Sequence, residues 1–124
     1  MPDTLAYVAG AVLILWGAAH IAATKSVAGS FEAVSVDNRR IFVMEWVAEG
    51  VTHVSIGALV ILIAALEGTG DAVSDLVYRV LAGVLVVLAV ITALTGARTP
   101  VIWFKICPFV LTGAAALLLI SSAL

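Results

Sequence analysis

Four long apolar stretches, separated by short polar segments, divide the chain: residues 4–23, 41–66, 77–97 and 101–124. Each reaches the length of about 20 residues that an α-helix needs to cross the hydrocarbon of a bilayer. Lipid offers no hydrogen-bond partners to the backbone, so segments of this kind fold as helices. The pattern therefore predicts an all-α fold, an integral membrane up-down bundle of four transmembrane helices in a single domain, 1–124.

The segments between these stretches predict how the helices begin and connect. Asp37 is placed to cap the second helix, and either Asp71 or Ser74 the third. The connection over residues 24–40 is the one long loop, and it carries apolar residues among small polar ones. Two interpretations are open: the loop rests on the headgroups, or it covers its end of the bundle as a cytoplasmic lid.

The amino-acid composition is also typical of a protein embedded in a bilayer. The hydrophobic fraction is 64% and the charged fraction 11%, whereas soluble domains carry about a quarter charged residues. A net charge of −2 without a basic run argues against a nucleic-acid partner. A single cysteine, Cys107, excludes an intrachain disulfide. The first apolar stretch lacks the basic flank of a secretory signal, so we expect a retained helix.

The basic residues predict the orientation. Five of the six Lys and Arg residues lie at or beside the first and third loops: Lys25, Arg39, Arg40, Arg98 and Lys105. Cytoplasmic loops carry such an excess, so both termini are expected outside a plasma (inner) membrane. The tryptophans are expected at the cytoplasmic interface, where this residue is enriched: Trp16, Trp46 and Trp103.

The second apolar stretch contains an unusual polar stripe. Glu45, Glu49 and His53 are spaced by four, so they share one face of a helix. A charge at bilayer depth costs at least about 2.5 kcal/mol, so the stripe must face the bundle interior or a wet cavity. Glu45 can lie at headgroup level, paired with Arg40 or Lys105. Glu49 and His53 lie deeper and need an interior partner or a function.

Other helices add polar groups at the same end. His20, near the end of the first stretch, is expected at the level of Glu45. It continues an inward-facing series of Gly10, Leu13 and Gly17, whose glycines would let another helix approach closely. The third stretch adds Thr92 and Thr95, and the fourth adds Lys105 and Cys107. This one-sided distribution predicts a polar pocket within the bundle.

Three functional classes fit such a pocket. In the first, Glu49 and His53 are a catalytic proton-transfer pair acting on a small lipophilic ligand such as an isoprenoid or quinone-like molecule, with His20 and Glu45 at the entrance. Such chemistry needs no cofactor, and whether the protein is an enzyme stays open. The structural alternative is that Glu49 and His53 are a satisfied pair, hydrogen-bonded across helices to fix their register.

The second class is metal or haem binding, and the third is non-catalytic. The candidate ligands are His20, Glu45, Glu49, His53 and Cys107. Ferritin-like bundles use Glu-x-x-His, whereas this stripe is spaced by four throughout, so the spacing permits a metal without indicating one. The third class covers an accessory subunit of a larger membrane complex, a homo-oligomer, or a proton or ion transporter.

Three short motifs carry a resemblance. VDNRRIFVMEWVAEGV (Val36–Val51), WGAAH (Trp16–His20) and KICP (Lys105–Pro108) resemble a family of small uncharacterised four-helix bacterial integral membrane proteins. DoxX-like proteins are similar in size and hydropathy. Small multidrug resistance transporters are similar in outline, but their essential glutamate is on the first helix, where this chain has His20. The resemblance implies four helices and no activity.

Overall fold

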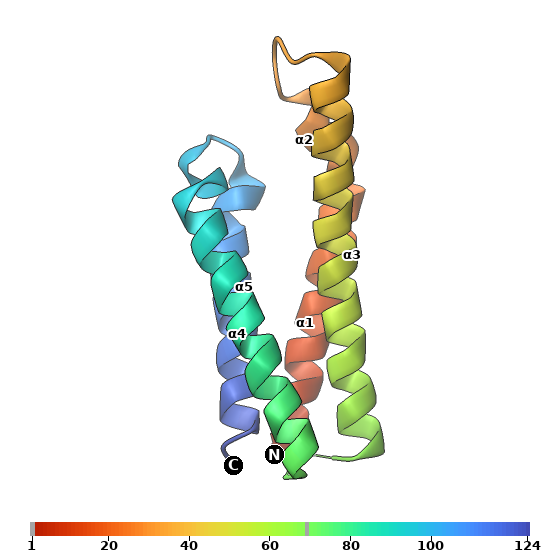
Figure 1. Cartoon of the computed structure of the whole chain (residues 1–124), viewed down its shortest axis with the longest axis vertical. Coiled ribbons are helices and arrows are strands. Elements are labelled where there is room, and N and C mark those ends of the chain that lie inside the picture. Colours follow the sequence, from red (N-terminus) through yellow and green to blue (C-terminus); the bar gives the residue numbers. More distant parts are fainter. Residues whose placement is uncertain (1, 69) are drawn as a thin grey trace.

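The computed structural model describes residues 2–68 and 70–124, and within them it contains helices and no strands. In chain order the elements are α1 (Pro2–Ala22), α2 (Thr24–Gly29), α3 (Val36–Leu66), α4 (Ala72–Leu94), the 3₁₀ helix η1 (Gly96–Arg98) and α5 (Ile102–Ser121). Figure 1 shows the four long helices side by side. The predicted all-α four-helix bundle is confirmed.

The outer surface of the bundle is apolar. Four helices within the described residues are long and apolar enough to cross a membrane: α1, α3, α4 continued through η1, and α5. Large side chains such as Leu15, Leu62 and Phe109 are exposed, and a soluble monomer does not present apolar surface on this scale to water. The chain is therefore a multi-pass membrane protein whose outer face contacts lipid.

The helices are not packed equally against one another. α1 packs along α3 and also against α5, and α5 packs along α4, whereas α3 and α4 make little contact. Figure 1 shows two pairs that approach at the end holding both termini and the α3–α4 connection and diverge towards α2 and η1. We call these the terminal end and the loop end. The α3–α4 seam is thus the weak interface of the bundle.

Four glycines bring the backbones of α1 and α3 into contact. A Cβ at Gly17 would lie 2.5 Å from the carbonyl oxygen of Gly50, and one at Gly57 would lie 2.5 Å from that of Gly10. No real Cβ tolerates such distances, so each position requires a residue without a side chain. The close approach predicted for Gly10 and Gly17 is confirmed, and α3 supplies the matching pair.

The terminal end is packed with apolar side chains and held by hydrogen bonds. Small and branched side chains from all four long helices meet in one core that includes Ala6, Val60 and Leu85. The Ser121 hydroxyl donates to the carbonyl of Pro2 at 2.8 Å, and the Arg79 guanidinium donates to that of Ser122 at 2.8 Å. The first contact joins α5 to the start of α1, and the second joins α4 to the residue that follows α5.

The long connection is more helical than the sequence pattern indicated. α3 begins at Val36 instead of residue 41, because the Ser35 hydroxyl caps it by accepting the Asn38 amide at 3.1 Å. The predicted cap, Asp37, lies inside the helix. Arg39 holds the preceding segment by donating to the carbonyls of Ala28 and Phe31. The connection therefore packs onto α3 as a short helix and a tight turn.

The third long helix also begins earlier than expected. α4 begins at Ala72 instead of residue 77, since the Asp71 carboxylate accepts the amides of Val73 and Ser74 at 2.9 and 3.1 Å. Of the two caps predicted for this helix, Asp71 is confirmed. An aspartate at this position also favours the helix through its dipole.

The glycine contact predicts a specific loss of stability. Gly17→Ala should lower the free energy of unfolding by about 1–3 kcal/mol, because the new methyl group forces two backbones apart. Gly83→Ala is the matched control, because nothing lies within 4 Å of its Cβ position. That change should be neutral or raise stability by up to about 1 kcal/mol through helix propensity. Unfolding by SDS, followed by tryptophan fluorescence, measures both; equal stability of the two variants would contradict the contact.

Candidate functional site

The glycine contact sets His20 of α1 against the polar stripe of α3. His20 Nε2 lies 3.6 Å from Glu49 Oε2. We expected His20 at the level of Glu45, and the structure places it one helical turn deeper. Glu45 is exposed. Arg40, one of its predicted partners, instead places its Nη1 atom 3.4 Å from Oδ1 of Asp37. The pair that the structure brings together is therefore His20 and Glu49.

Trp46 fixes the position of His20. The indole stacks on the imidazole with ring centroids 3.7 Å apart and an interplanar angle of 16°. The indole nitrogen also donates to the backbone carbonyl of His20 at 2.7 Å. Trp46 is 2% exposed, so a buried hydrogen bond and a buried ring contact join the same two residues. The imidazole is held in one plane by its neighbour.

His53 completes a buried pair of histidines. Its ring meets that of His20 edge-on at 6.0 Å, and the two residues are 0% and 1% exposed. Within the described chain, neither nitrogen of either ring has a hydrogen-bond partner. An unsatisfied buried polar group costs about 1–3 kcal/mol. The structural alternative requires hydrogen bonds to these rings, and the described residues provide none.

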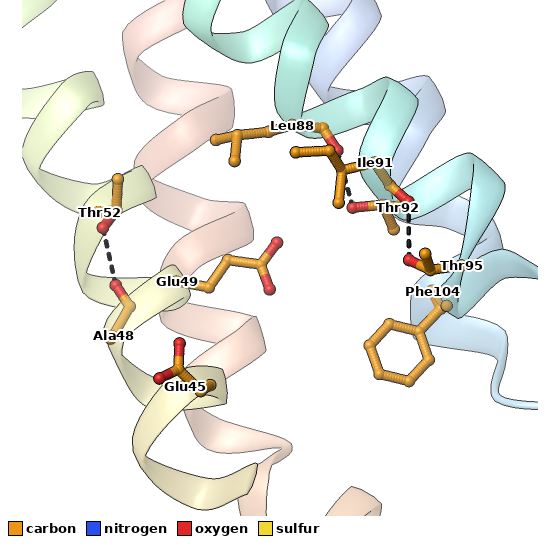
Figure 2. A pocket seen from close by; sticks show the side chains of 10 residues that line it. Glu45, Ala48, Glu49, Thr52, Leu88, Ile91, Thr92, Thr95 and Phe104 are labelled. Carbon is orange, nitrogen blue, oxygen red and sulfur yellow. Dashed lines mark hydrogen bonds between the residues drawn. The ribbon is translucent and has the colours of Figure 1, made fainter. Parts of the chain in front are cut away.

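A cavity lies on the other side of Glu49. It has a volume of about 410 Å³ and lies between α3 and the α4–η1–α5 corner. Its lining residues are Glu45, Ala48, Glu49, Thr52, Leu88, Ile91, Thr92, Thr95, Gly96 and Phe104. Figure 2 shows the Glu49 carboxylate pointing from α3 towards Leu88, Ile91 and Thr92 of α4. The side chain of Glu49 is 30% exposed, so it faces the cavity while its carboxylate also approaches His20.

The threonine hydroxyls in the lining are engaged by their own helices. Thr52 donates to the carbonyl of Ala48 at 2.8 Å, Thr92 to that of Leu88 at 2.9 Å, and Thr95 to that of Ile91 at 2.7 Å. These bonds are drawn in Figure 2. The hydroxyl protons are therefore not available to a ligand, and the carboxylates of Glu45 and Glu49 are the strongest polar groups of the cavity.

Aromatic rings surround the inner side of the site. Trp46 meets Phe104 edge-on, and Trp16 lies beside Trp103, with ring centroids 5.3 Å and 5.5 Å apart respectively.

The sequence indicated interfacial tryptophans but missed their contact with His20. The signal was the spacing: Trp16 and His20 are four apart, and Trp46 and Glu49 three apart, so each pair shares a helix face. Leu88 and Ile91 were missed because an apolar residue on a lipid-facing helix carries no distinguishing mark.

The predicted metal ligands do not assemble. Within residues 2–68 and 70–124, no three or more His, Cys, Asp or Glu side chains form a group that could hold a metal ion. Cys107 is buried on α5, where it interacts with Trp16, Thr92 and Glu49. Of the other candidate ligands, only Glu49 is among these neighbours of Cys107. The predicted lid segment, 24–40, contributes no residue to the cavity lining.

Comparison with protein families, with characterised proteins and with solved structures finds no match. The function of the site is therefore inferred from its geometry alone.

The unsatisfied imidazole of His53 predicts a gain of stability on its removal. His53→Leu keeps the volume and removes two buried polar atoms, so the free energy of unfolding should rise by about 1 kcal/mol or more. Ser55→Ala, on an exposed position of the same helix, should change it by less than about 0.5 kcal/mol. Thermal unfolding in a mild detergent measures both variants. A loss of stability in His53→Leu would show that the ring makes a structural hydrogen bond.

Proposed function

We propose that this membrane protein binds a small lipophilic ligand in the cavity between α3 and α4 and exchanges a proton with it through Glu49. The observation that carries the proposal is the position of Glu49, whose carboxylate lies between a cavity and the buried His20. Ionisable residues at membrane depth are functional candidates because of their insertion cost. The cavity volume of about 410 Å³ falls within the range of about 300–1,000 Å³ typical of small-molecule sites.

The open α3–α4 seam supports entry from the bilayer. The cavity lies where these two helices make little contact, and Ile91 on its α4 wall is 54% exposed. A ligand dissolved in the membrane can reach such a cavity sideways, with its apolar part remaining against lipid-facing side chains. This path favours a lipophilic ligand over a water-soluble one.

The arrangement of Glu49 and His20 supports proton exchange. A separation of 3.6 Å is slightly longer than a direct hydrogen bond, so a small side-chain movement closes it. The Glu49 carboxylate can accept a proton from the polar head of a ligand, and the neutral imidazole of His20 can then accept that proton from Glu49. The reverse sequence returns it. His53 lies edge-on to His20, so a positive charge on His53 disfavours the protonated ring of His20, whereas a neutral His53 does not.

A proton path across the whole membrane is not supported. Towards the terminal end of the described structure, the core beyond His53 consists of apolar and small side chains, including Ile56, Val60 and Leu85. A neutral buried tyrosine, Tyr78, lies among them. Proton movement therefore ends at the histidines, which fits exchange with a bound ligand better than transport.

In the proposed exchange Glu49 alternates between the ionised and the protonated form. A lipophilic carbodiimide, which reacts with protonated carboxyl groups in apolar surroundings, should therefore modify it. Dicyclohexylcarbodiimide should label the protein in membranes at Glu49, and the isoprenoid alcohol farnesol should protect it by occupying the cavity. Ile91→Trp should slow labelling about tenfold or more, because the larger side chain fills the cavity from the opposite wall. Mass spectrometry of the intact protein and of its peptides provides the measurement.

Matched variants make this test specific. Glu49→Gln should abolish the label, whereas Glu32→Gln, a change in the exposed connection outside the cavity, should leave it unchanged. Labelling that is unaffected by farnesol and by Ile91→Trp would contradict the proposal. An accessory subunit would instead tolerate Glu49→Gln and co-purify with its partner proteins.

We also propose that the loop end faces the cytoplasm of a cell with a plasma (inner) membrane, with both termini outside. The support is the excess of Lys and Arg around the first and third loops. Alkaline phosphatase fused after Leu124 should be active, and green fluorescent protein at the same position should be dark. Alkaline phosphatase inserted between Ser30 and Phe31 should be inactive. The opposite set of signals would reverse the orientation.

A further inference from the structure

The cavity between α3 and α4 is acidic at one wall, and none of the described residues that line it is basic. Glu45 and Glu49 are its two charged residues, both on α3, and the α4 wall presents Leu88, Ile91 and two threonines. The carboxylates are separated by one helical turn, about 6 Å along the axis. A ligand head that enters here meets two carboxylates and no positive charge.

The other polar groups in the lining also act as acceptors. The three threonine hydroxyls each donate their proton to a carbonyl of their own helix, so only their oxygen lone pairs face outwards. When both glutamates are ionised, the lining offers a ligand hydrogen-bond acceptors from every polar side chain. A complementary head must therefore supply the protons.

Building on the proposed function, we propose that the cavity selects amphiphiles whose head donates hydrogen bonds and carries no negative charge, such as long-chain amines and alcohols. The head lies between Glu45 and Glu49, and the chain extends past Leu88 and Ile91 towards the bilayer. Anionic lipids and fatty acids are excluded, because a negatively charged head beside Glu45 and the ionised form of Glu49 meets no cation among the lining residues.

The buried His20 is an independent observation that points to a ligand here. It is 1% exposed, neither ring nitrogen has a hydrogen-bond partner among the described residues, and Nε2 points at a Glu49 oxygen 3.6 Å away. A head that donates to one oxygen of Glu49 leaves the other for His20. The ligand then binds Glu49 from the cavity side, and a small movement of the carboxylate lets its other oxygen accept from His20 on the core side.

Competition among four amphiphiles, each with a saturated chain of twelve carbons, tests this selectivity. A diazirine-bearing dodecanol is photolysed with the protein in phosphatidylcholine nanodiscs, and the labelled residues are mapped by mass spectrometry. Dodecylamine, dodecanol, dodecyl methyl ether and laurate then compete at equal mole fraction in the membrane. The ether keeps the oxygen of dodecanol and lacks its proton, so this pair isolates hydrogen-bond donation.

We expect labels on Leu88, Ile91 or Phe104, with the amine and the alcohol competing at about tenfold lower mole fraction than the ether and laurate. Glu45→Gln and Glu49→Gln should each reduce the advantage of the amine over laurate, and Glu32→Gln should retain it. Ile91→Trp keeps both acids and should remove labelling of the cavity altogether.

The other outcomes separate the two proposals. Labelling confined to the cavity with equal competition by all four probes would overturn the selectivity and leave lipophilic binding standing. Stronger competition by laurate would do the same. Labelling spread evenly over the lipid-facing surface, unchanged by Ile91→Trp, would overturn both the selectivity and the proposed function.

Discussion

The backbone contact between α1 and α3 is the constraint on which the rest of the molecule depends. Gly10 and Gly17 meet Gly57 and Gly50 so closely that no side chain fits between them. In a membrane, where lipid is as apolar as leucine, such close packing is a main source of helix association. The contact fixes the antiparallel register, and the register alone brings His20 of α1 to Trp46, Glu49 and His53 of α3.

The bundle places both buried histidines and the acidic cavity towards the loop end. Apolar packing and hydrogen bonds close the terminal end, while α3 and α4 diverge towards the loop end and leave a cavity at Glu49. Beside it lie two buried imidazoles that form no hydrogen bond with any described residue. Proteins retain such costs where a site needs them, and the well-packed terminal half offsets the loss of stability. The position of both buried histidines beside the acidic cavity is the strongest argument for function.

Much of the fold could be predicted from the sequence, because spans of lipid length, paired glycines and Asp71 are local signals. The start of α3 could not, since serine and aspartate are similarly good caps and the sequence alone does not distinguish Ser35, which caps the helix, from Asp37. The polar stripe was evident from the sequence. Its partner, His20, was expected at the level of Glu45, whereas the structure places it beside Glu49. Counting residues from a loop fixes depth only to about one turn of helix. The one-sided polar residues predicted a pocket, but its position between α3 and α4 had no signal, because it arises from two helices that do not pack together.

A density map of the protein in lipid nanodiscs tests the central claim most directly. The account predicts elongated density between α3 and α4, with its polar end within hydrogen-bond distance of the Glu49 carboxylate and its apolar end beside Ile91. His20 should lie on the opposite side of that carboxylate. A map in which α4 packs against Glu49 and closes the cavity, with the imidazoles of His20 and His53 hydrogen-bonded between helices, would contradict it.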